Sequence, residues 1–283
     1  MLCATDARRP TPAAGAPMNA AAPHEAQRLA FGRAATLYDR VRPSYPPAAI
    51  DAVIHAARLQ PPARILEVGA GTGKATVLLA ARGLRVIGLE PSGAMAAVAR
   101  ANCKEFDGVE IAEVEFERWQ PRERLPALVC AASWHWISPA SRYRLASAAL
   151  LPGGTLAAMW TFPAWTRCAT RHALSDAYRA AAPDLAAEFP MHPDSAPDRL
   201  AGDWRAEIDG SESFTGPVLM TFPWEKAYTS AEYVLLLQTH QDHILLEEPD
   251  KGRLLAAVAD TIDAVGGIIT MPYTTLVCLA TRR

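Results

Sequence analysis

A short segment near residue 70 combines an acid, three alternate glycines and a lysine. Residues 67–74 read E-V-G-A-G-T-G-K and follow a short apolar run. A strand leading into a glycine loop and then a helix is where α/β proteins bind a nucleoside-like ligand, because glycine allows a tight turn and close backbone approach. A dinucleotide fingerprint needs a small residue in place of Lys74, and a P-loop needs a glycine in place of Val68 and a hydroxyl in place of Ala75. The segment therefore fits neither phosphate-binding motif.

A second acid, Glu90, follows the next apolar run, residues 84–89, and lies seventeen residues after Gly73. An acid at the end of the second strand of such a fold can accept hydrogen bonds from both ribose hydroxyls of a ligand. NAD-binding folds use the same device, and an acid also suits the N-terminus of the helix that follows, where the helix dipole favours negative charge. Together with Glu67 and the missing phosphate motifs, Glu90 favours a nucleoside ligand.

The pattern E-x-G-x-G-x-G resembles motif I of class I S-adenosylmethionine-dependent methyltransferases. This cofactor has no phosphate and carries cationic sulfonium and ammonium groups, so an acid beside the loop is favourable. Further segments are similar to small-molecule methyltransferases related to trans-aconitate methyltransferase: residues 31–46, the pair His135-Trp136, residues 151–156, and Gly266-Gly267 with Pro272-Tyr273. The resemblance spans about residues 30–283. It implies a Rossmann-like α/β fold with a seven-strand, mostly parallel sheet, helices on both faces and a cap inserted after the fifth strand.

Strand and helix patterns alternate from about residue 46, as expected for a parallel sheet with crossover helices. We expect strands at residues 65–68, 84–89, 109–114, 128–132, 155–160, near 217–223, and at 268–280. Proline-rich residues 161–210 interrupt the alternation, and we interpret them as the substrate cap of a methyltransferase domain at residues 28–283. Residues 1–27, rich in alanine and proline, are expected to form a disordered leader.

In open α/β sheets the ligand lies at the carboxyl ends of the strands, so the residues there are the candidates for cofactor binding. Phe116 can stack on an adenine ring and Glu117 can accept from its amino group. Ala132 and Ser133 are small enough for the methionine tail to lie against the backbone. In full, the predicted cofactor-binding residues are Tyr38, Arg42, Glu67, Gly69, Ala70, Gly71, Gly73, Glu90, Pro91, Met95, Phe116, Glu117, Ala132 and Ser133.

His135 is the candidate catalytic residue, since it is the titratable side chain at the fourth strand end that can act near neutral pH. Its position between two tryptophans equally suits a packed histidine without a catalytic role. His240 and His243 lie three residues apart but have no further ligand set nearby, so no metal site is predicted; they line a substrate pocket or lie at a solvated helix end. The predicted substrate-binding residues are Tyr45, Trp136, Trp160, Trp165, Tyr233, His240 and His243.

The composition and charge of the chain limit the kinds of molecule that it is expected to bind. The 283 residues carry a net charge of −2 and include five cysteines, which are scattered and form no C-x-x-C pair, as is typical of a reduced cytoplasmic protein. Basic residues form no stripe with aromatics, and no apolar run reaches the length of a membrane span. We therefore expect a cytoplasmic monomer or homodimer that binds a small-molecule acceptor and neither nucleic acid nor membrane.

The leading hypothesis is an enzyme that transfers a methyl group from S-adenosylmethionine to an oxygen, nitrogen or sulfur atom of a small molecule. Alignment of the two reactants supplies much of the rate in such a displacement. A carboxylate acceptor needs no base, whereas a phenol, amine or thiol could lose its proton to His135, His240 or His243. Two alternatives are a lyase or cyclase that breaks the same cofactor, and a non-catalytic subunit that only binds it.

Overall fold

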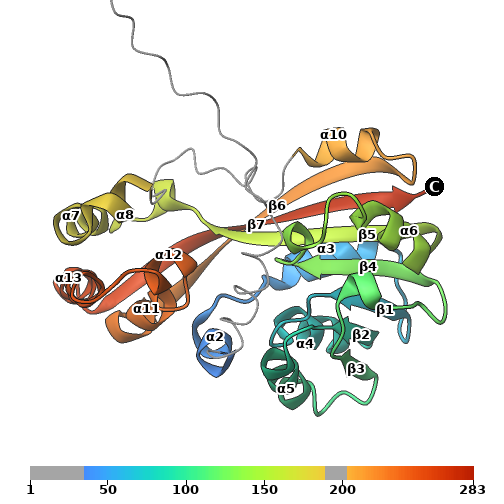
Figure 1. Ribbon diagram of the computed structural model, residues 1–283, viewed down its shortest axis with the longest axis horizontal. Helices are drawn as coiled ribbons and strands as arrows, with labels where there is room; N and C mark the ends of the chain where they lie inside the picture. Colours follow the sequence, from blue (N-terminus) through green and yellow to red (C-terminus); the bar gives the residue numbers. More distant parts are fainter. Residues whose placement is uncertain (1–34, 189–202) are drawn as a thin grey trace, which may run out of the picture.

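The computed structural model describes residues 35–188 and 203–283, and a seven-stranded sheet runs through it (Figure 1). The strand order is β3-β2-β1-β4-β5-β7-β6. The strands are β1 (Arg64–Val68), β2 (Arg85–Leu89), β3 (Val109–Ala112), β4 (Leu125–Ala131), β5 (Leu150–Pro163), β6 (Phe214–Thr229) and β7 (Ile268–Arg282). Strands β1 to β5 pair in parallel, and β7 lies antiparallel between β5 and β6. The predicted Rossmann-like, mostly parallel α/β sheet is confirmed.

Helices cover both faces of the parallel part of the sheet. Successive strand residues point to opposite faces, so Ile65 joins the core beneath α3 (Pro47–Ala56) and α4 (Lys74–Ala80), while Leu66 joins the core on the other face. That second core also contains residues of α6 (Arg142–Ala149) and α10 (Trp204–Asp209). Both faces of β1 are thereby buried, which explains the apolar residues Ile65, Leu66 and Val68 in this strand.

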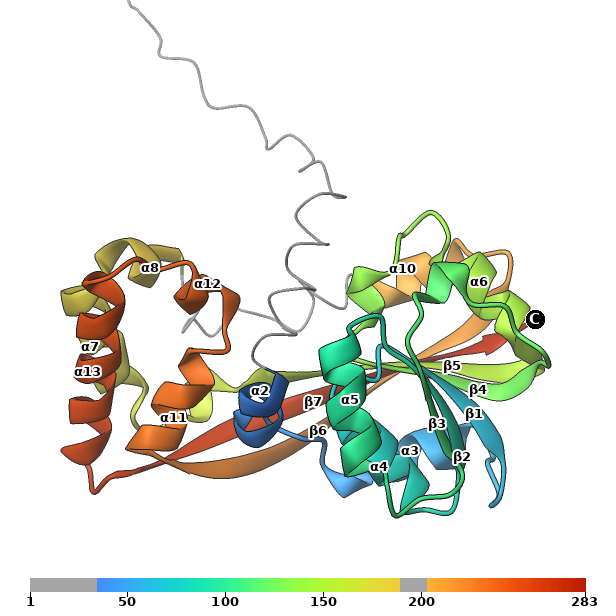
Figure 2. The ribbon, with the colours of Figure 1, turned by 60° about the horizontal axis from the view of Figure 1, so that its bottom comes forward.

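Strands β5, β6 and β7 continue beyond the parallel strands and carry a second group of helices, here called the helical lobe (Figures 1 and 2). The lobe contains α7 (Arg171–Ala181), α8 (Pro183–Glu188), α11 (Ser230–Leu237), α12 (Gln241–Ile244) and α13 (Asp250–Asp263). Its apolar side chains form a core separate from the two cores of the sheet. The lobe is therefore built from two segments, one after β5 and one between β6 and β7.

This arrangement differs from a cap made of residues 161–210 alone. Residues 161–163 belong to β5, and α7 and α8 join the helical lobe, but α10 packs on the sheet. The reason is the burial of Trp204 and Ile208, which are 1% and 0% exposed in the sheet core. The role of the lobe as a substrate cover stays a prediction.

Helix α2 (Ala35–Val41) lies between the helical lobe and the sheet, beside α5 (Gly93–Asn102) (Figure 2). It contacts both α5 and α11. The predicted leader, residues 1–27, and residues 31–34 of the predicted entry segment lie outside the described residues. Within the part of the chain that the structure describes, no helix has the length and apolarity needed to cross a membrane.

Candidate functional site

A cavity of about 350 Å³ opens at the carboxyl ends of the parallel strands, where α2, the residues after β1, β2, β3 and β4, and residues 160–162 of β5 meet. All the predicted cofactor-binding residues except Gly73 line this cavity. The sheet order brings them together, because β2 and β4 flank β1 and their carboxyl ends lie at one edge. Their individual contacts with a cofactor stay predictions.

The glycine loop turns from β1 into α4 with positive φ angles at Gly69, Gly71 and Gly73. A Cβ at Gly69 would lie 2.4 Å from Cβ of Ser133, and a Cβ at Gly73 would lie 3.2 Å from Cα of Ala99. Glycine is therefore required at both positions, because neighbouring segments of the chain pack closely against them. Gly73 is the N-cap of α4 and does not line the cavity. A Cβ at Gly71 would meet no atom of the described residues within 4 Å, so its free side is available to a ligand.

Glu67 is a completely buried carboxyl group in the wall of the cavity. Its Oε2 accepts a 2.6 Å hydrogen bond from Oγ1 of Thr76, whereas its Oε1 has no hydrogen-bond partner among the described residues. Burial raises the pKa of Glu67 to about 8, the bond from Thr76 opposes this rise, and the charge of Glu90 adds to it. A buried, unsatisfied carboxyl oxygen is costly by itself and suits a cationic ligand group.

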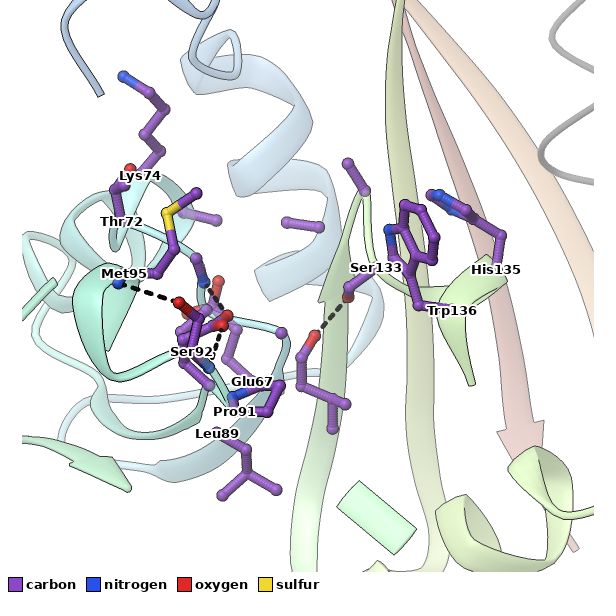
Figure 3. Close-up of a pocket in the computed structure, with 18 of the residues that line it drawn as sticks. Glu67, Thr72, Lys74, Leu89, Pro91, Ser92, Met95, Ser133, His135 and Trp136 are labelled. Carbon is purple, nitrogen blue, oxygen red and sulfur yellow. Dashed lines mark hydrogen bonds between the residues drawn. The ribbon is translucent and has the colours of Figure 1, made fainter. Parts of the chain in front are cut away.

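Glu90 is held in place by backbone groups at the end of β2. Its Oε2 accepts from the amide of Gly71 and its Oε1 from the amide of Ser92, each at 2.9 Å. A carboxylate oxygen can accept more than one hydrogen bond, so both oxygens retain capacity for ligand hydroxyls. Figure 3 shows Glu67, Ser92 and Met95 gathered at one side of the site, with Trp136 and His135 at the other.

The second side of the cavity is formed by the residues that follow β4. Ala132 has a φ of 56°, an uncommon conformation for a residue other than glycine, and Ser133 Oγ donates a hydrogen bond to the carbonyl of Val68. A short 3₁₀ turn, Trp134–Trp136, then places His135 and Trp136 at the cavity. The indole N–H of Trp160, on β5, donates to Nδ1 of His135 at 3.1 Å. This side offers aromatic surface with one imidazole.

Tyr38, in α2, and Arg42, the residue after α2, line the cavity, and this segment is hydrogen-bonded to both the helical lobe and the sheet side. Nε of Arg42 donates to Thr239 Oγ1 at 2.8 Å, and its Nη2 donates to the carbonyl of Thr239 at 2.6 Å. On the sheet side, the backbone carbonyl of Asp39 accepts from Nζ of Lys74 at 2.5 Å. Arg42 therefore directs these donors to the helical lobe, and its pairing with a cofactor carboxylate stays a prediction.

The predicted substrate-binding residues separate into two groups. Tyr45, Trp136 and Trp160 line the cavity. Trp165, Tyr233, His240 and His243 do not line it, and their role in acceptor binding stays a prediction. Trp165 and Tyr233 are 7% and 3% exposed in the core of the helical lobe. The rings of Trp165 and Tyr233 are packed between the helices of the lobe, which explains why they do not reach the cavity.

His240 and His243 lie at the junction of α11 and α12 in the helical lobe. His243 is fully buried, with its Nδ1 2.8 Å from Asp242 Oδ1 and its Nε2 2.7 Å from the hydroxyl of Tyr178. Burial, Arg42 and His243 together lower the pKa of His240 well below its usual value. Although ligand atoms of His240, Asp242 and His243 lie within 4.8 Å of one another, both ring nitrogens of His243 are already hydrogen-bonded. The geometry favours a structural role over metal binding.

Several cavity residues were not predicted from the sequence. They include Thr72, Ser92, Ile137 and Thr161. Two of these residues could have been predicted from their positions in the sequence. Thr72 lies within the glycine loop, and Ser92 lies two residues after Glu90. Thr72 Oγ1 is buried and without a partner among the described residues, so it is a further candidate for a ligand contact.

Comparison with known proteins shows which family part of this chain resembles. Residues 65–154 match the model of a family described as "Methyltransferase domain". These residues are therefore similar to a methyltransferase domain. S-adenosylmethionine is the cofactor of such domains, and the cavity fits it: the unsatisfied oxygen of Glu67 suits a cationic group, and Glu90 suits a ribose diol.

Relatives of this chain include uncharacterized methyltransferases of Mycobacterium tuberculosis and Mycobacterium bovis. Each is 39% identical over 132 residues, which are 47% of this chain and 52% of the relative. The chain thus matches about half the length of these relatives. A putative type II methyltransferase from Anaeromyxobacter dehalogenans has a similar structure, with a TM-score of 0.58, 19% identity, and coverage of 86% of this chain and 97% of that one. This similarity supports the fold.

Proposed function

We propose that the whole protein transfers a methyl group from S-adenosylmethionine to a small-molecule acceptor. The observation that carries the proposal is the cavity itself, which joins a buried acidic side at Glu67 and Glu90 to an aromatic side at Trp136 and Trp160. The acidic side suits the charged and hydroxylated parts of the cofactor. The aromatic side has the apolar surface that binds small organic molecules.

Methyl transfer from a sulfonium is a single in-line displacement, in which the cofactor leaves as a neutral thioether. It requires alignment of the acceptor lone pair with the S–CH₃ bond and exclusion of water. Tyr38, from α2, and Trp160, from β5, line the cavity from different elements. We assign Tyr45, Trp136 and Trp160 to the acceptor side.

The charges around the cavity favour an uncharged or singly charged acceptor. Arg42 and Lys74 are the arginine and lysine of the described chain that line it. Arg42 donates to Thr239, and Lys74 donates to Asp39. A tricarboxylate would need several cations free to bind it. The proposed kinship with enzymes related to trans-aconitate methyltransferase therefore concerns the overall layout, and the acceptor atom is proposed only as oxygen, nitrogen or sulfur.

We further propose a cytoplasmic monomer or homodimer that acts on small molecules and not on nucleic acid. The two alternatives, a lyase or cyclase and a non-catalytic binding subunit, are separated from the leading proposal by the products. Incubation with methyl-labelled S-adenosylmethionine and a metabolite extract should yield S-adenosylhomocysteine and a labelled small molecule. Methylthioadenosine would instead indicate a lyase or cyclase. Tight binding of S-adenosylhomocysteine without turnover of any acceptor would indicate a binding subunit.

A further inference from the structure

The turn between β4 and α6 forms one wall of the cavity while its middle is anchored in the protein interior. Residues 133 and 135–137 line the cavity, whereas Trp134 is 1% exposed in the sheet core. Trp134 to Trp136 form a single 3₁₀ turn, in which the amide of Trp136 donates to the carbonyl of Ser133 at 2.9 Å. Because neighbouring residues of so short a turn move together, the packing of Trp134 determines where Trp136 lies.

Trp134 is enclosed by side chains from two helices. Its ring centroid lies 5.3 Å from that of Tyr143, on α6, and 6.2 Å from that of Trp204, on α10. The guanidinium carbon of Arg142, also on α6, lies 5.3 Å from the ring centroid of Trp134, which is within the range of a cation–π interaction. The indole N–H of Trp204 donates to the carbonyl of Leu279 at 3.0 Å, so α10 is itself fixed to β7.

Glu207, on α10, orients the two side chains of α6 that contact Trp134. Its Oε2 accepts one hydrogen bond from Nη2 of Arg142 and one of 2.7 Å from the hydroxyl of Tyr143. Burial and the charge of Glu207 raise the pKa of Tyr143, so the phenol keeps the proton that it donates. Glu207, Arg142 and Tyr143 do not line the cavity. Any effect of Glu207 on the site is therefore indirect.

The ion pair between Arg142 and Glu207 is poorly suited to stabilise the fold by itself. The two side chains are 11% and 30% exposed, and Nε of Arg142 is buried without a hydrogen-bond partner among the described residues. Removing charges from water costs free energy that a buried pair recovers only when its polar atoms are well hydrogen-bonded. The orientation that the pair imposes on the guanidinium, and hence on Trp134, explains it better than net stabilisation does.

We propose that Glu207 is a positioning residue for the acceptor side of the cavity. Through its two bonds to α6 it holds Trp134 in place, and the 3₁₀ turn then fixes the position of Trp136. The inference rests on the proposed methyl transfer, in which Trp136 is assigned to the acceptor side. Glu207 belongs to residues 161–210, which the sequence predicts as a cap. This part of that segment acts on the acceptor from behind the turn.

Fluorine-19 NMR of the full-length protein labelled with 5-fluorotryptophan, with bound S-adenosylhomocysteine, tests the proposal. The chain has seven tryptophans, and Trp136→Phe identifies the signal of Trp136 by its disappearance. Glu207→Ala should shift or broaden this signal. Glu207→Gln should shift it less, because the amide oxygen can still accept from both donors. An unchanged Trp136 signal in Glu207→Ala would overturn the proposal even if other core tryptophans shifted, since that result would show a structural role alone.

Asp209→Asn is the matched control for the loss of charge. Asp209 is an exposed acid two residues further along α10, and its replacement should leave the Trp136 signal unchanged. An equal shift in Asp209→Asn would show an effect of helix charge and overturn the assigned contact. If Glu207→Ala does not fold, Tyr143→Phe replaces it, because it removes one of the two bonds to Glu207 and keeps the aromatic ring. A smaller shift in the same direction as in Glu207→Gln is then expected, and no shift would overturn the proposal.

Kinetics with methyl-labelled S-adenosylmethionine measure the consequence for the acceptor. The probes are a panel of carboxylic acids, phenols, amines and thiols, and the constants are measured with the member that is methylated fastest. Glu207→Ala should raise the KM of this probe by up to about tenfold, the value of one well-packed aromatic contact. Affinity for S-adenosylhomocysteine should stay within about twofold. Equal weakening of both would show a general loss of structure and overturn the assigned role.

The proposed function and this inference fail in different ways. If calorimetry shows no binding of S-adenosylhomocysteine, the proposed function is wrong, and fluorine NMR of the unliganded protein still tests the link from Glu207 to Trp136. If binding and turnover occur but Glu207→Ala leaves the Trp136 signal unchanged, the assigned role of Glu207 is wrong while methyl transfer is retained.

Discussion

Thr76 Oγ1 lies 2.6 Å from Oε2 of Glu67 and joins the first helix after the glycine loop to the end of β1. The bond satisfies one oxygen of a fully buried carboxyl group and leaves the other without a partner among the described residues. The carboxyl group is consequently easier to protonate than in water. Glu67 thus couples the stability of the protein, and its affinity for a cation, to pH.

We predict that Glu67→Gln becomes more stable, relative to the unaltered protein, as pH rises. The pKa of Glu67 is raised from 4.5 to about 8 in the folded state. Between these values the folded state binds the extra proton, so its stabilising effect is complete below pH 4.5 and is lost as pH approaches 8. The glutamine amide would keep an oxygen to accept from Thr76 without titrating. Thermal unfolding at pH 5, 7 and 9 measures the difference.

The matched control for this measurement is Glu105→Gln. The Glu105 side chain is 79% exposed, so its replacement should change stability by less than about 0.5 kcal/mol at all three pH values. If Glu67→Gln and Glu105→Gln had the same pH dependence, Glu67 would not be the titrating group.

Binding of S-adenosylmethionine should release a proton near pH 7. A cation placed beside Glu67 favours the ionised carboxylate and so opposes the effect of burial. Calorimetry in two buffers of different ionisation enthalpy measures the protons released. Glu67→Gln should abolish the buffer dependence, and an unchanged release in this variant would place the cofactor's cationic groups elsewhere.

Gly71→Val should prevent cofactor binding while the protein stays folded. A Cβ at Gly71 meets no described atom within 4 Å, so the added side chain occupies the cavity and not the protein interior. Gly153→Val is the matched control, because Gly153 also has a positive φ, 75°, and open space around it, but it does not line the cavity. Both variants carry the backbone strain, and only Gly71→Val should lose affinity for S-adenosylhomocysteine in calorimetry. Equal affinity in the two would contradict the site.

Substitutions in the helical lobe should change stability and not cofactor affinity. Tyr178→Phe removes the hydrogen bond to His243 and should cost about 1 kcal/mol of unfolding free energy. Trp165→Ala empties part of the lobe core and should cost about 3–5 kcal/mol. Denaturant unfolding and calorimetry measure the two quantities. Arg179→Ala, an exposed position on α7, is the control, and a loss of cofactor affinity in Tyr178→Phe would mean that the lobe contributes to the cofactor site.

Local sequence patterns are sufficient to predict many of the residues on the acidic side of the cavity, where the cofactor is proposed to bind. The glycine loop, Glu67 and Glu90 lie within 24 residues of one another, and each owes its position to the strand or turn that contains it. General rules of parallel sheets then bring further strand ends to the same edge. For this reason the sequence also predicts Phe116, Ala132 and Ser133 at the cavity, and they line it.

Contacts between distant segments were decided by the tertiary structure alone. The sequence around Trp165 and His243 shows aromatic and polar residues near a substrate cap, but only the packing of α7 against α13 and α12 shows that they are buried in a separate core. Strand β6 is predicted near residues 217–223, yet it spans Phe214–Thr229. It is the edge strand, with most of its residues exposed or half-buried. Its backbone pairs with β7, and such long-range pairing leaves little local pattern.

The sequence by itself determined the fold class and the acidic glycine loop, because periodicity and glycine geometry act over a few neighbouring residues. Only the tertiary structure placed the ring of His135 beside Trp160. The indole N–H of Trp160, 25 residues away in the sequence, donates a hydrogen bond to His135 because β4 and β5 pair side by side. A hydrogen bond depends on distance and direction in space, and those are set by the packed sheet.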